Sequence, residues 1–184
     1  MTPPKEDWTF EIFLKEYDKL KAEQTQRFAF RDNLIYVNLI AISGTLSIAG
    51  TDVVRILLLL VLPMICIVLG WTYLVNDEKI SAIGRYIRYT LSDKIRAATQ
   101  SEDQDIFGWE TAHRDDPKRM SRKIIQLVVD EIVFVLPGFI AILMFWINAP
   151  DVLLSLRWVS GVEAILLVIL GAQIYSYADL KKGK

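Results

Sequence analysis

The sequence is poor in the residues on which enzymes and metal sites depend. It contains one cysteine, Cys66, and one histidine, His113, which excludes an intrachain disulfide and a Cys–His metal cluster within the chain. The GxSxG, HExxH, Walker-type and GxGxxG motifs of hydrolases, metalloproteases and nucleotide-binding enzymes are also missing. We therefore expect no catalytic residue, no metal site, no cofactor and no enzymatic activity.

A surplus of basic charge is missing as well. Lysine and arginine together number 21 against 22 aspartate and glutamate residues, and the formal net charge is −1. Proteins that bind duplex nucleic acid normally carry a basic surplus, so we expect no such partner. The first residues, MTPPKEDWTFEIF, lack the basic, apolar and small-residue order of a signal peptide, and we expect none there.

What the sequence does have is apolar residues gathered in long blocks. Hydrophobic residues make up 53% of the chain, and their clustering differs from the amphipathic spacing of a soluble domain. A hydrocarbon core of about 30 Å needs a helix of about 20 apolar residues, so each block predicts a membrane span. The blocks are residues 33–50, 53–75, 127–149 and 152–177.

The distribution of positive charge predicts the topology. Only short connections join the first block to the second and the third to the fourth, which indicates two transmembrane hairpins. Lysine and arginine concentrate in residues 1–32, in residues 76–126 and in the tail 178–184, whereas both hairpin turns are nearly free of these basic residues. Because positive charge stays on the cytoplasmic side, we expect both termini and the middle segment in the cytoplasm.

The segments outside the blocks are predicted to be mostly helical. Residues 1–32 and the segment after residue 76 each carry an apolar stripe at helical spacing, whereas residues 99–116 predict a loop. The first amphipathic helix is either interfacial or packed on a neighbouring subunit, and the second either lies on the membrane or extends the span as a stalk. Asp116–Pro117 is a helix start that predicts a helix of about 33 residues running through the third block. The stripes are Phe10, Phe13, Tyr17, Leu20, Gln24 and Phe28, then Ile80, Ile83, Ile87, Leu91 and Ile95.

The fold class that follows is an all-α polytopic membrane protein with two transmembrane hairpins, four spans and cytoplasmic amphipathic helices. Four thin helices enclose only a slender pathway, so we expect a symmetric homo-oligomer, for example a tetramer.

Polar residues inside the blocks are the first set of candidate functional residues. An ionisable group in hydrocarbon costs about 2.5–3.5 kcal/mol on insertion scales and is rarely kept without a use. Glu163 in the fourth block predicts a pore, cation site or proton relay, with a carboxylate paired to an arginine or a neutral acid at a helix contact as alternatives. Asn33 and Asn38 make the first block polar enough to pack on other helices or line water. Asp130 and Glu131 predict an acidic ring at the cytoplasmic end of a pore or a solvated helix shoulder.

Two further sets of residues complete the candidates. Pro137 and Gly138 predict a kink or flexible point within the third span. A basic cytoplasmic group predicts either topology and contact with anionic lipid or a site for an anionic regulator such as a nucleotide, with Trp109 available for stacking. Its members are Arg85, Arg88, Arg96, Arg114, Lys118, Arg119, Arg122 and Lys123.

The chain carries the strings NDEKISAIGRYIR at residues 76–88, FGWETAHR at 107–114 and VLPGFIA at 135–141. With these strings it resembles a group of small bacterial integral membrane proteins with four spans, which implies the bacterial inner membrane. The plan of membrane hairpins around a cytoplasmic helical part is also similar to that of membrane effectors in anti-phage systems of the CBASS or Hailong kind. In those systems a nucleotide signal controls a protein that breaches the inner membrane.

We therefore expect an oligomeric, ligand-regulated ion channel or pore-forming membrane effector, acting in anti-phage defence. The alternative is a non-conducting membrane scaffold or sensor subunit that anchors a cytoplasmic partner. The expected partners are the lipid bilayer, further copies of the chain, and a nucleotide or oligonucleotide regulator or the enzyme that makes it.

Overall fold

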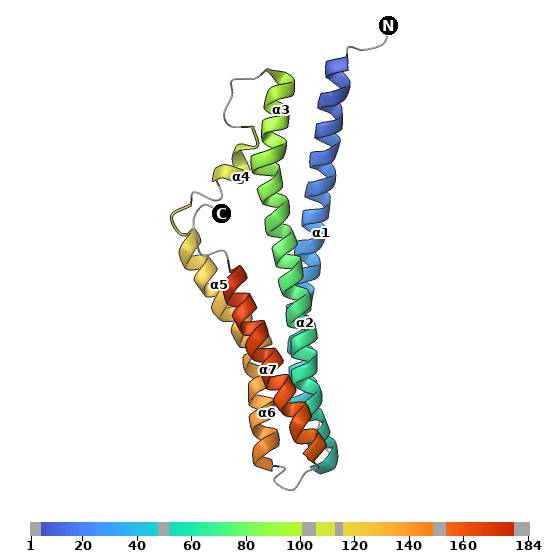
Figure 1. Ribbon diagram of the computed structural model, residues 1–184, viewed down its shortest axis with the longest axis vertical. Helices are drawn as coiled ribbons and strands as arrows, with labels where there is room; N and C mark the ends of the chain where they lie inside the picture. The colour runs from blue at the N-terminus through green and yellow to red at the C-terminus, as the bar shows by residue number, and fades with distance from the viewer. Residues whose placement is uncertain (1–4, 48–51, 101–105, 113–115, 149–153, 179–184) are drawn as a thin grey trace. The chain divides into compact units, whose positions relative to one another are not determined.

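The protein is helical wherever its computed structural model describes it, which is over residues 5–47, 52–100, 106–112, 116–148 and 154–178. Every regular element in these ranges is a helix and none is a strand (Figure 1), which confirms the all-α prediction. The predicted hairpin turns and the basic tail lie outside the described residues. The elements are α1 (Lys5–Ser47), α2 (Asp52–Tyr86), a π-helical turn (Ile87–Leu91), α3 (Ser92–Thr99), α4 (Gly108–Ala112), α5 (Arg119–Phe134), α6 (Leu136–Asn148) and α7 (Leu154–Tyr177).

Three helical stretches are long and apolar enough to cross a membrane, and α1 is not among them. Their outward side chains are large and apolar: Leu143, Trp158 and Ile165 expose 59%, 70% and 62% of their surface. Such faces are unfavourable in water and favourable in hydrocarbon, so these helices are typical of a membrane protein. The stretches are Leu58–Thr99, Arg119–Asn148 and Leu154–Tyr177.

The chain divides into two compact units, and α1 and α2 contribute residues to both. The first unit comprises Met1–Phe30 and Asn76–Arg119, and the second comprises Arg31–Val75 and Met120–Lys184. Composition alone places the boundaries between cytoplasmic and membrane residues after residues 32, 75 and 126, close to those of the compact units. The location of the first unit in the cytoplasm and of the second unit in the membrane stays a prediction.

Apolar stripes from two long helices form the core of the first unit. Ile87 and Leu91 are fully buried and Ile95 is 4% exposed, and the first four residues of the α1 stripe pack against them. The two stripes thus pack against each other within one chain, whereas the sequence predicts that the first amphipathic helix is interfacial or packed on a neighbouring subunit. The second helix continues from α2 as a stalk. Phe28, the last predicted member of the α1 stripe, is instead 40% exposed. Arg27 takes the inward position and donates a hydrogen bond to the Asn76 amide oxygen at 3.1 Å.

The π-helical turn keeps the second stripe on one face. From Ile83 to Ile95 the apolar residues follow at four-residue steps, and each step advances about 40° beyond a full α-helical turn. Three such steps would rotate Ile95 well away from the core. In the π turn the N–H of Ser92 bonds to the carbonyl of Ile87, five residues earlier, which adds a residue to the turn. Ile87, Leu91 and Ile95 therefore face the same way.

A short helix interrupts the segment 99–116, which the sequence predicts as a loop. Phe107, just before α4, has a φ of 62°, a left-handed conformation that is strained for a bulky residue. Its ring stacks on Tyr17 with centroids 4.2 Å apart and planes 8° apart, which holds this turn against α1. The predicted helix start at Asp116 is confirmed, because its carboxylate accepts a hydrogen bond from the Lys118 N–H at 2.8 Å.

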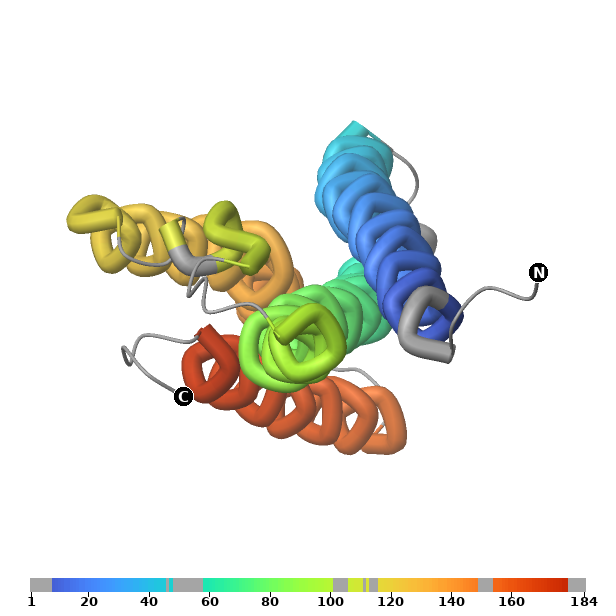
Figure 2. Tube along the Cα trace, turned by 90° about the horizontal axis from the view of Figure 1, so that it is seen from above, coloured from blue at the N-terminus to red at the C-terminus, as the bar shows by residue number. Residues whose placement is uncertain are grey.

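In the second unit, segments of four helices share one apolar core. Figure 2 shows this unit with α1 and α7 on opposite sides of α2. Because each segment turns only one face inward, the remaining faces stay apolar and exposed. The core residues include Leu34 of α1, Leu74 of α2, Phe134 of α5 and Leu170 of α7.

Two glycines allow the helices of the second unit to approach closely. A Cβ on Gly70 would stand 2.7 Å from Cδ2 of Leu170 and 3.0 Å from Cβ of Phe134. A Cβ on Gly138 would stand 2.8 Å from Cδ1 of Leu167. Small residues at helix contacts are typical of membrane bundles, where packing drives helix association.

The third predicted span is divided into two helices. The sequence predicts one helix of about 33 residues, but α5 ends at Phe134, Val135 forms a turn and α6 begins at Leu136. The cause is Pro137, whose nitrogen carries no hydrogen and cannot bond to the carbonyl four residues earlier. The helical bonds on either side persist, from the Val135 N–H to Glu131 at 3.0 Å and from the Phe139 N–H to Val135 at 3.2 Å.

Candidate functional site

Glu163 is the most deeply buried carboxyl side chain of the membrane-type helices. It lies on the inward face of α7, where Ser160, Glu163, Leu167, Leu170 and Ile174 recur at three- and four-residue spacing. Its side chain is only 2% exposed, and Oε2 has no hydrogen-bond partner among the described residues. The predicted carboxyl in an apolar span is therefore placed inside the bundle, facing away from lipid.

Ser160, one helical turn before Glu163, already donates its hydroxyl proton to another group. Ser160 is fully buried, and its hydroxyl donates to the carbonyl of Arg157 at 2.8 Å. It accepts a hydrogen bond from Nε1 of Trp146 at 3.1 Å. Because a hydroxyl has one proton to donate, Ser160 has none left for the Glu163 carboxyl.

Asn38 of α1 is fully buried and contacts the break between α5 and α6. Its Nδ2 donates a hydrogen bond to the carbonyl of Val133 at 2.6 Å. Val133 precedes Pro137 by four residues, so this carbonyl is the one that the proline leaves without a helical partner. Oδ1 of Asn38 is buried and has no hydrogen-bond partner among the described residues. Asn38 therefore caps a broken helix, whereas Asn33 on the same helix is exposed.

Asp130 belongs to a polar cluster between α1, α2 and α5. It is 7% exposed and Tyr73 is 3% exposed, and the Asp130 carboxylate interacts with the Tyr73 hydroxyl. That hydroxyl also accepts a hydrogen bond from Nε2 of Gln126 at 3.2 Å. The guanidinium of Arg31 lies 5.8 Å from the centroid of the Tyr73 ring. Neither Tyr73 nor Gln126 is an ionised residue within an apolar block, so the sequence analysis did not single out either of them.

Glu131 has different surroundings from those of Asp130. It is half-buried on α5, and its Oε2 lies 3.0 Å from the position that a Cβ on Gly171 of α7 would take. Adjacent residues on a helix point about 100° apart, so the two carboxylates do not share one environment. The predicted acidic ring requires several copies of the chain and stays a prediction.

The predicted basic group is mostly engaged in separate local contacts. In the first unit Arg85 pairs with Glu78 at 3.6 Å and Arg96 pairs with Asp93 at 3.0 Å. The Arg88 guanidinium lies 4.6 Å from the centroid of the Tyr89 ring, and its Nε is buried without a hydrogen-bond partner in the described part of the chain. Each of these three arginines therefore contacts a neighbour on its own helical stretch.

The remaining members of the basic group divide between the two units. Lys118 is exposed and Arg119 is half-buried in the first unit, and Arg122 and Lys123 belong to the second. Trp109, predicted as a stacking residue, is 73% exposed on α4. Arg114 lies outside the described residues.

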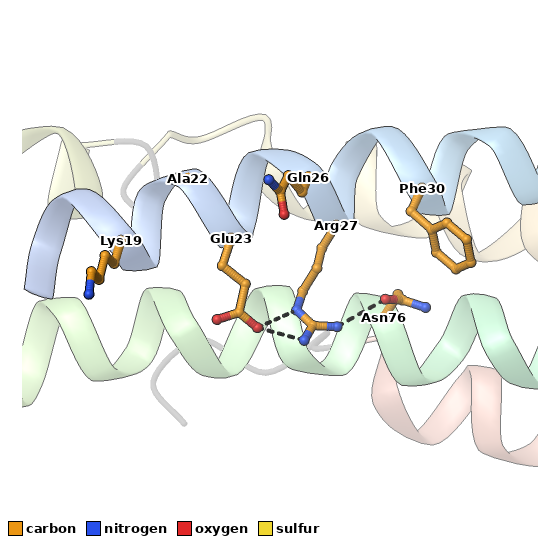
Figure 3. A pocket seen from close by; sticks show the side chains of 7 residues that line it. All are labelled: Lys19, Ala22, Glu23, Gln26, Arg27, Phe30 and Asn76. Carbon is orange, nitrogen blue, oxygen red and sulfur yellow. Dashed lines mark hydrogen bonds and ion pairs between the residues drawn. The ribbon is translucent and has the colours of Figure 1, made fainter.

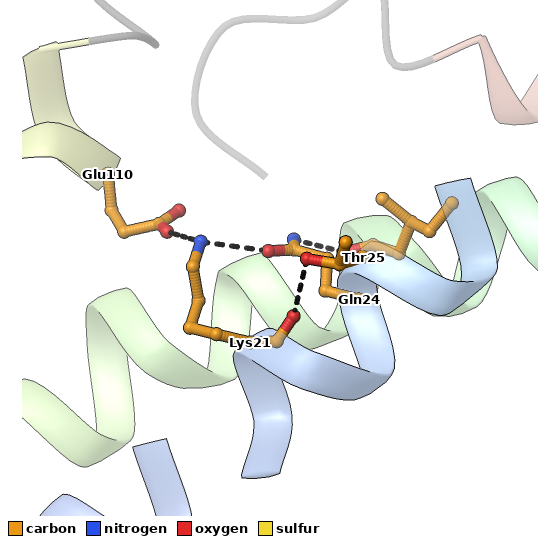
Figure 4. Close-up of polar contacts among 5 residues, drawn as sticks. Lys21, Gln24, Thr25 and Glu110 are labelled. Carbon is orange, nitrogen blue, oxygen red and sulfur yellow. Dashed lines mark hydrogen bonds and ion pairs between the residues drawn. The ribbon is translucent and has the colours of Figure 1, made fainter. Parts of the chain in front are cut away.

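A polar network in the first unit holds α4 against α1, and the sequence gives no sign of it. Nζ of Lys21 donates to the Glu110 carboxylate at 2.6 Å and to Oε1 of Gln24 at 2.9 Å (Figure 4). Nε2 of the buried Gln24 donates to the carbonyl of Ile80 at 3.3 Å. Lys21 and Glu110 are 89 residues apart in the chain, which is why local patterns cannot pair them.

A second polar contact joins α1 to the stalk of the first unit. The Tyr86 hydroxyl donates to the Glu16 carboxylate at 2.6 Å and accepts a hydrogen bond from Nζ of Lys94 at 3.1 Å. The bond to Tyr86 raises the pKa of Lys94 above its ordinary value, because it favours the charged ammonium. With the Lys21 network, this contact fixes α1 at two levels.

An open groove follows α1 in the first unit, with a volume of about 640 Å³ (Figure 3). Its floor includes the ion pair in which Arg27 donates to Glu23 through Nε at 2.9 Å, and Phe30 at one end is 50% exposed. Charged, amide and aromatic groups therefore line one surface. The lining residues are Lys19, Ala22, Glu23, Gln26, Arg27, Phe30 and Asn76.

The described residues contain no group of three or more His, Cys, Asp or Glu side chains that could hold a metal ion. Cys66 is fully buried against Leu62, Ala141 and Leu167, and its thiol also contacts the side chain of Asn38. The polar features of the second unit are a buried carboxyl at Glu163, a capped helix break and a tyrosine–aspartate cluster. Comparison of the chain with models of protein families, with curated proteins and with solved structures yields no match.

Proposed function

We propose that the protein is a non-enzymatic, homo-oligomeric membrane effector that passes ions across the bacterial inner membrane. Its first unit lies in the cytoplasm and receives a controlling signal from a nucleotide, an oligonucleotide or the enzyme that makes it. Its second unit contains four spans, the first of them residues 33–50, and both termini are cytoplasmic. The observation that carries the proposal is Glu163.

A carboxyl at this position is expensive for a purely structural role. Insertion of a charged residue at the centre of a membrane helix costs about 2.5–3.5 kcal/mol. Glu163 is 2% exposed, and its Oε2 has no partner within the described part of the chain. A leucine at the same place would pack without that cost. A retained carboxyl is therefore best explained by use, and a single carboxyl without further ligands suits a proton relay better than a hard-cation site.

Several copies of the chain are part of the proposal because one bundle is closed. Leu167, Phe134 and Phe145 are at most 1% exposed and fill the interior above and below the polar residues of the second unit. Water does not pass such a core. A pathway therefore forms between subunits, or opens within each bundle when the α5–α6 break moves.

Flux measurements in liposomes test the proposal. Purified protein should release a proton or potassium gradient when the controlling signal is present, and single-channel recording should show discrete openings. Glu163→Gln should slow proton flux at least about tenfold, equivalent to about 1.4 kcal/mol. Glu11→Gln, the same change on an exposed side chain of the first unit, is the matched control and should keep wild-type flux. The proposal fails if the protein passes no ions with candidate nucleotides added or removed, or if both variants conduct equally.

A second candidate function is a non-conducting scaffold or sensor subunit, and the groove along α1 favours it. That groove offers a partner helix a mixed surface of lysine, glutamate and exposed phenylalanine. Under this alternative, Glu163→Gln leaves the cellular phenotype intact, whereas Ala22→Trp fills the groove and abolishes capture of the partner. Charge reversal at Arg119, Arg122 and Lys123 should also abolish capture. Loss of phenotype with Glu163→Gln alone would exclude the scaffold.

A further inference from the structure

The contact between Asn38 and the α5–α6 break couples two features that are separate in the sequence. Pro137 leaves the Val133 carbonyl without its helical donor, and in an apolar interior such a carbonyl needs a partner. The amide of Asn38, 95 residues away in the chain, supplies that partner at 2.6 Å. The break between α5 and α6 therefore provides the carbonyl that Asn38 bonds to, and the packing of α1 in the second unit provides the donor that this carbonyl needs.

The same contact is only half satisfied, because Oδ1 of Asn38 is buried and has no donor among the residues that the structure describes. A buried polar group that makes some of its bonds stabilises the closed arrangement less than a fully bonded one. Water reaching this point would bond to Oδ1 and to the freed carbonyl together. The closed arrangement is thus poised to open.

We propose that Asn38 is a releasable latch on the proline break, and that movement of α1 controls it. Because α1 supplies residues to both units, a signal received by its first part reaches Asn38 along one helix. The role as a gate rests on the proposed ion-conducting function, whereas the latch itself does not. Asn38 is a positioning residue in this scheme, since it acts on the backbone of α5–α6.

A double-mutant cycle tests the latch without any ion flux. Asn38→Leu keeps the size of the side chain but removes the donor, and should lower the melting temperature in detergent by about 2–4 °C. Pro137→Ala restores the N–H that bonds to Val133, so in that background Asn38→Leu should cost less than half as much. Asn33→Leu, on the exposed side of the same helix, is the control and should behave alike in both backgrounds. Additive effects of Asn38→Leu and Pro137→Ala would overturn the latch.

A distance measurement covers the case in which Pro137→Ala does not fold. Spin labels are attached to cysteines introduced at the exposed positions 40 of α1 and 140 of α6 and report the separation of the two helices. The fully buried Cys66 is kept, because its thiol contacts Asn38. Asn38→Leu should broaden or lengthen the distance distribution, and Asn33→Leu should not. An unchanged distribution with Asn38→Leu would also overturn the proposal.

Flux then separates the latch from the channel. If both hold, Asn38→Leu should raise the basal flux in liposomes several-fold without added signal. If the coupling between Asn38 and Pro137 is present while no variant passes ions, the proposed function fails and the latch stands. If ions pass but the coupling is absent, the latch is wrong and the channel stands.

Discussion

The close packing at Gly70 predicts that replacement by alanine lowers the stability of the protein, whereas the same replacement at Gly161 should raise it. In Gly70→Ala the new Cβ would stand 3.0 Å from Cβ of Phe134 and 2.7 Å from Cδ2 of Leu170. The Phe134 Cβ is fixed to its backbone and moves only with α5, and Leu170 is 1% exposed and has no space to turn into. At Gly161 of α7 an added Cβ meets nothing within 4 Å.

Two effects of known size decide the outcome. Replacing glycine by alanine within a helix gains about 0.5–1 kcal/mol, and this gain applies to both sites. Overpacking a filled core costs about 1–3 kcal/mol, and this cost applies to Gly70 alone. Gly70→Ala should therefore lose about 1 kcal/mol and melt about 2–4 °C lower, whereas Gly161→Ala should melt about 2 °C higher.

The assay is thermal unfolding in detergent, followed by circular dichroism and by tryptophan fluorescence. Equal shifts of the same sign at Gly70 and Gly161 would refute the packing described for α2, α5 and α7. If Gly161→Ala lowers the melting temperature and also dissociates an oligomer, Gly161 lies at a contact between subunits.

Two further predictions concern the first unit. Lys21→Met removes the ammonium that lies 2.6 Å from the Glu110 carboxylate, whose side chain is 14% exposed, and should lower the free energy of unfolding by about 1–2 kcal/mol. Adding Glu110→Gln to Lys21→Met should recover part of this loss. If the effects of the two substitutions are fully additive, the pairing of Lys21 with Glu110 is contradicted. Gln100 ends α3 with φ 50° and ψ 30°, so Gln100→Gly should stabilise the protein by about 1 kcal/mol and Gln100→Val should destabilise it, which denaturant unfolding of both variants will check.

The features that the sequence predicts well are those that depend on neighbours within one or two helical turns. The apolar runs predict the membrane-type helices, and the spacing of Ile87, Leu91 and Ile95 predicts a buried face. The start of a helix at Asp116 follows from one side chain and the N–H two residues later. Where a local pattern fails, as at Phe28, the reason is a competing inward residue that spacing alone does not reveal.

The assignment of roles to polar residues depends on distant neighbours and could not be made from the sequence. The sequence predicts that Asn38 packs on other helices or lines water, and in the structure it packs on α5, where it caps the carbonyl freed by Pro137. The basic group is predicted to set the topology or to bind an anionic regulator, and spacing alone does not show that Arg85 and Arg96 pair with carboxylates one or two turns away. Asp130 and Glu131 are adjacent in the chain and have different partners, because neighbouring positions on a helix face different directions.

By itself, the sequence determined that this protein is helical, where three of its apolar helices run and which faces of its two stripes are buried. These properties follow from the solvent preference and periodicity of side chains, which are local. Only the tertiary structure decided which polar group meets which: Lys21 with Glu110, Asn38 with Val133, and Glu163 with no partner for its Oε2 among the described residues. Hydrogen bonds between segments about 90 residues apart depend on how helices pack, and that packing is set by the whole chain at once.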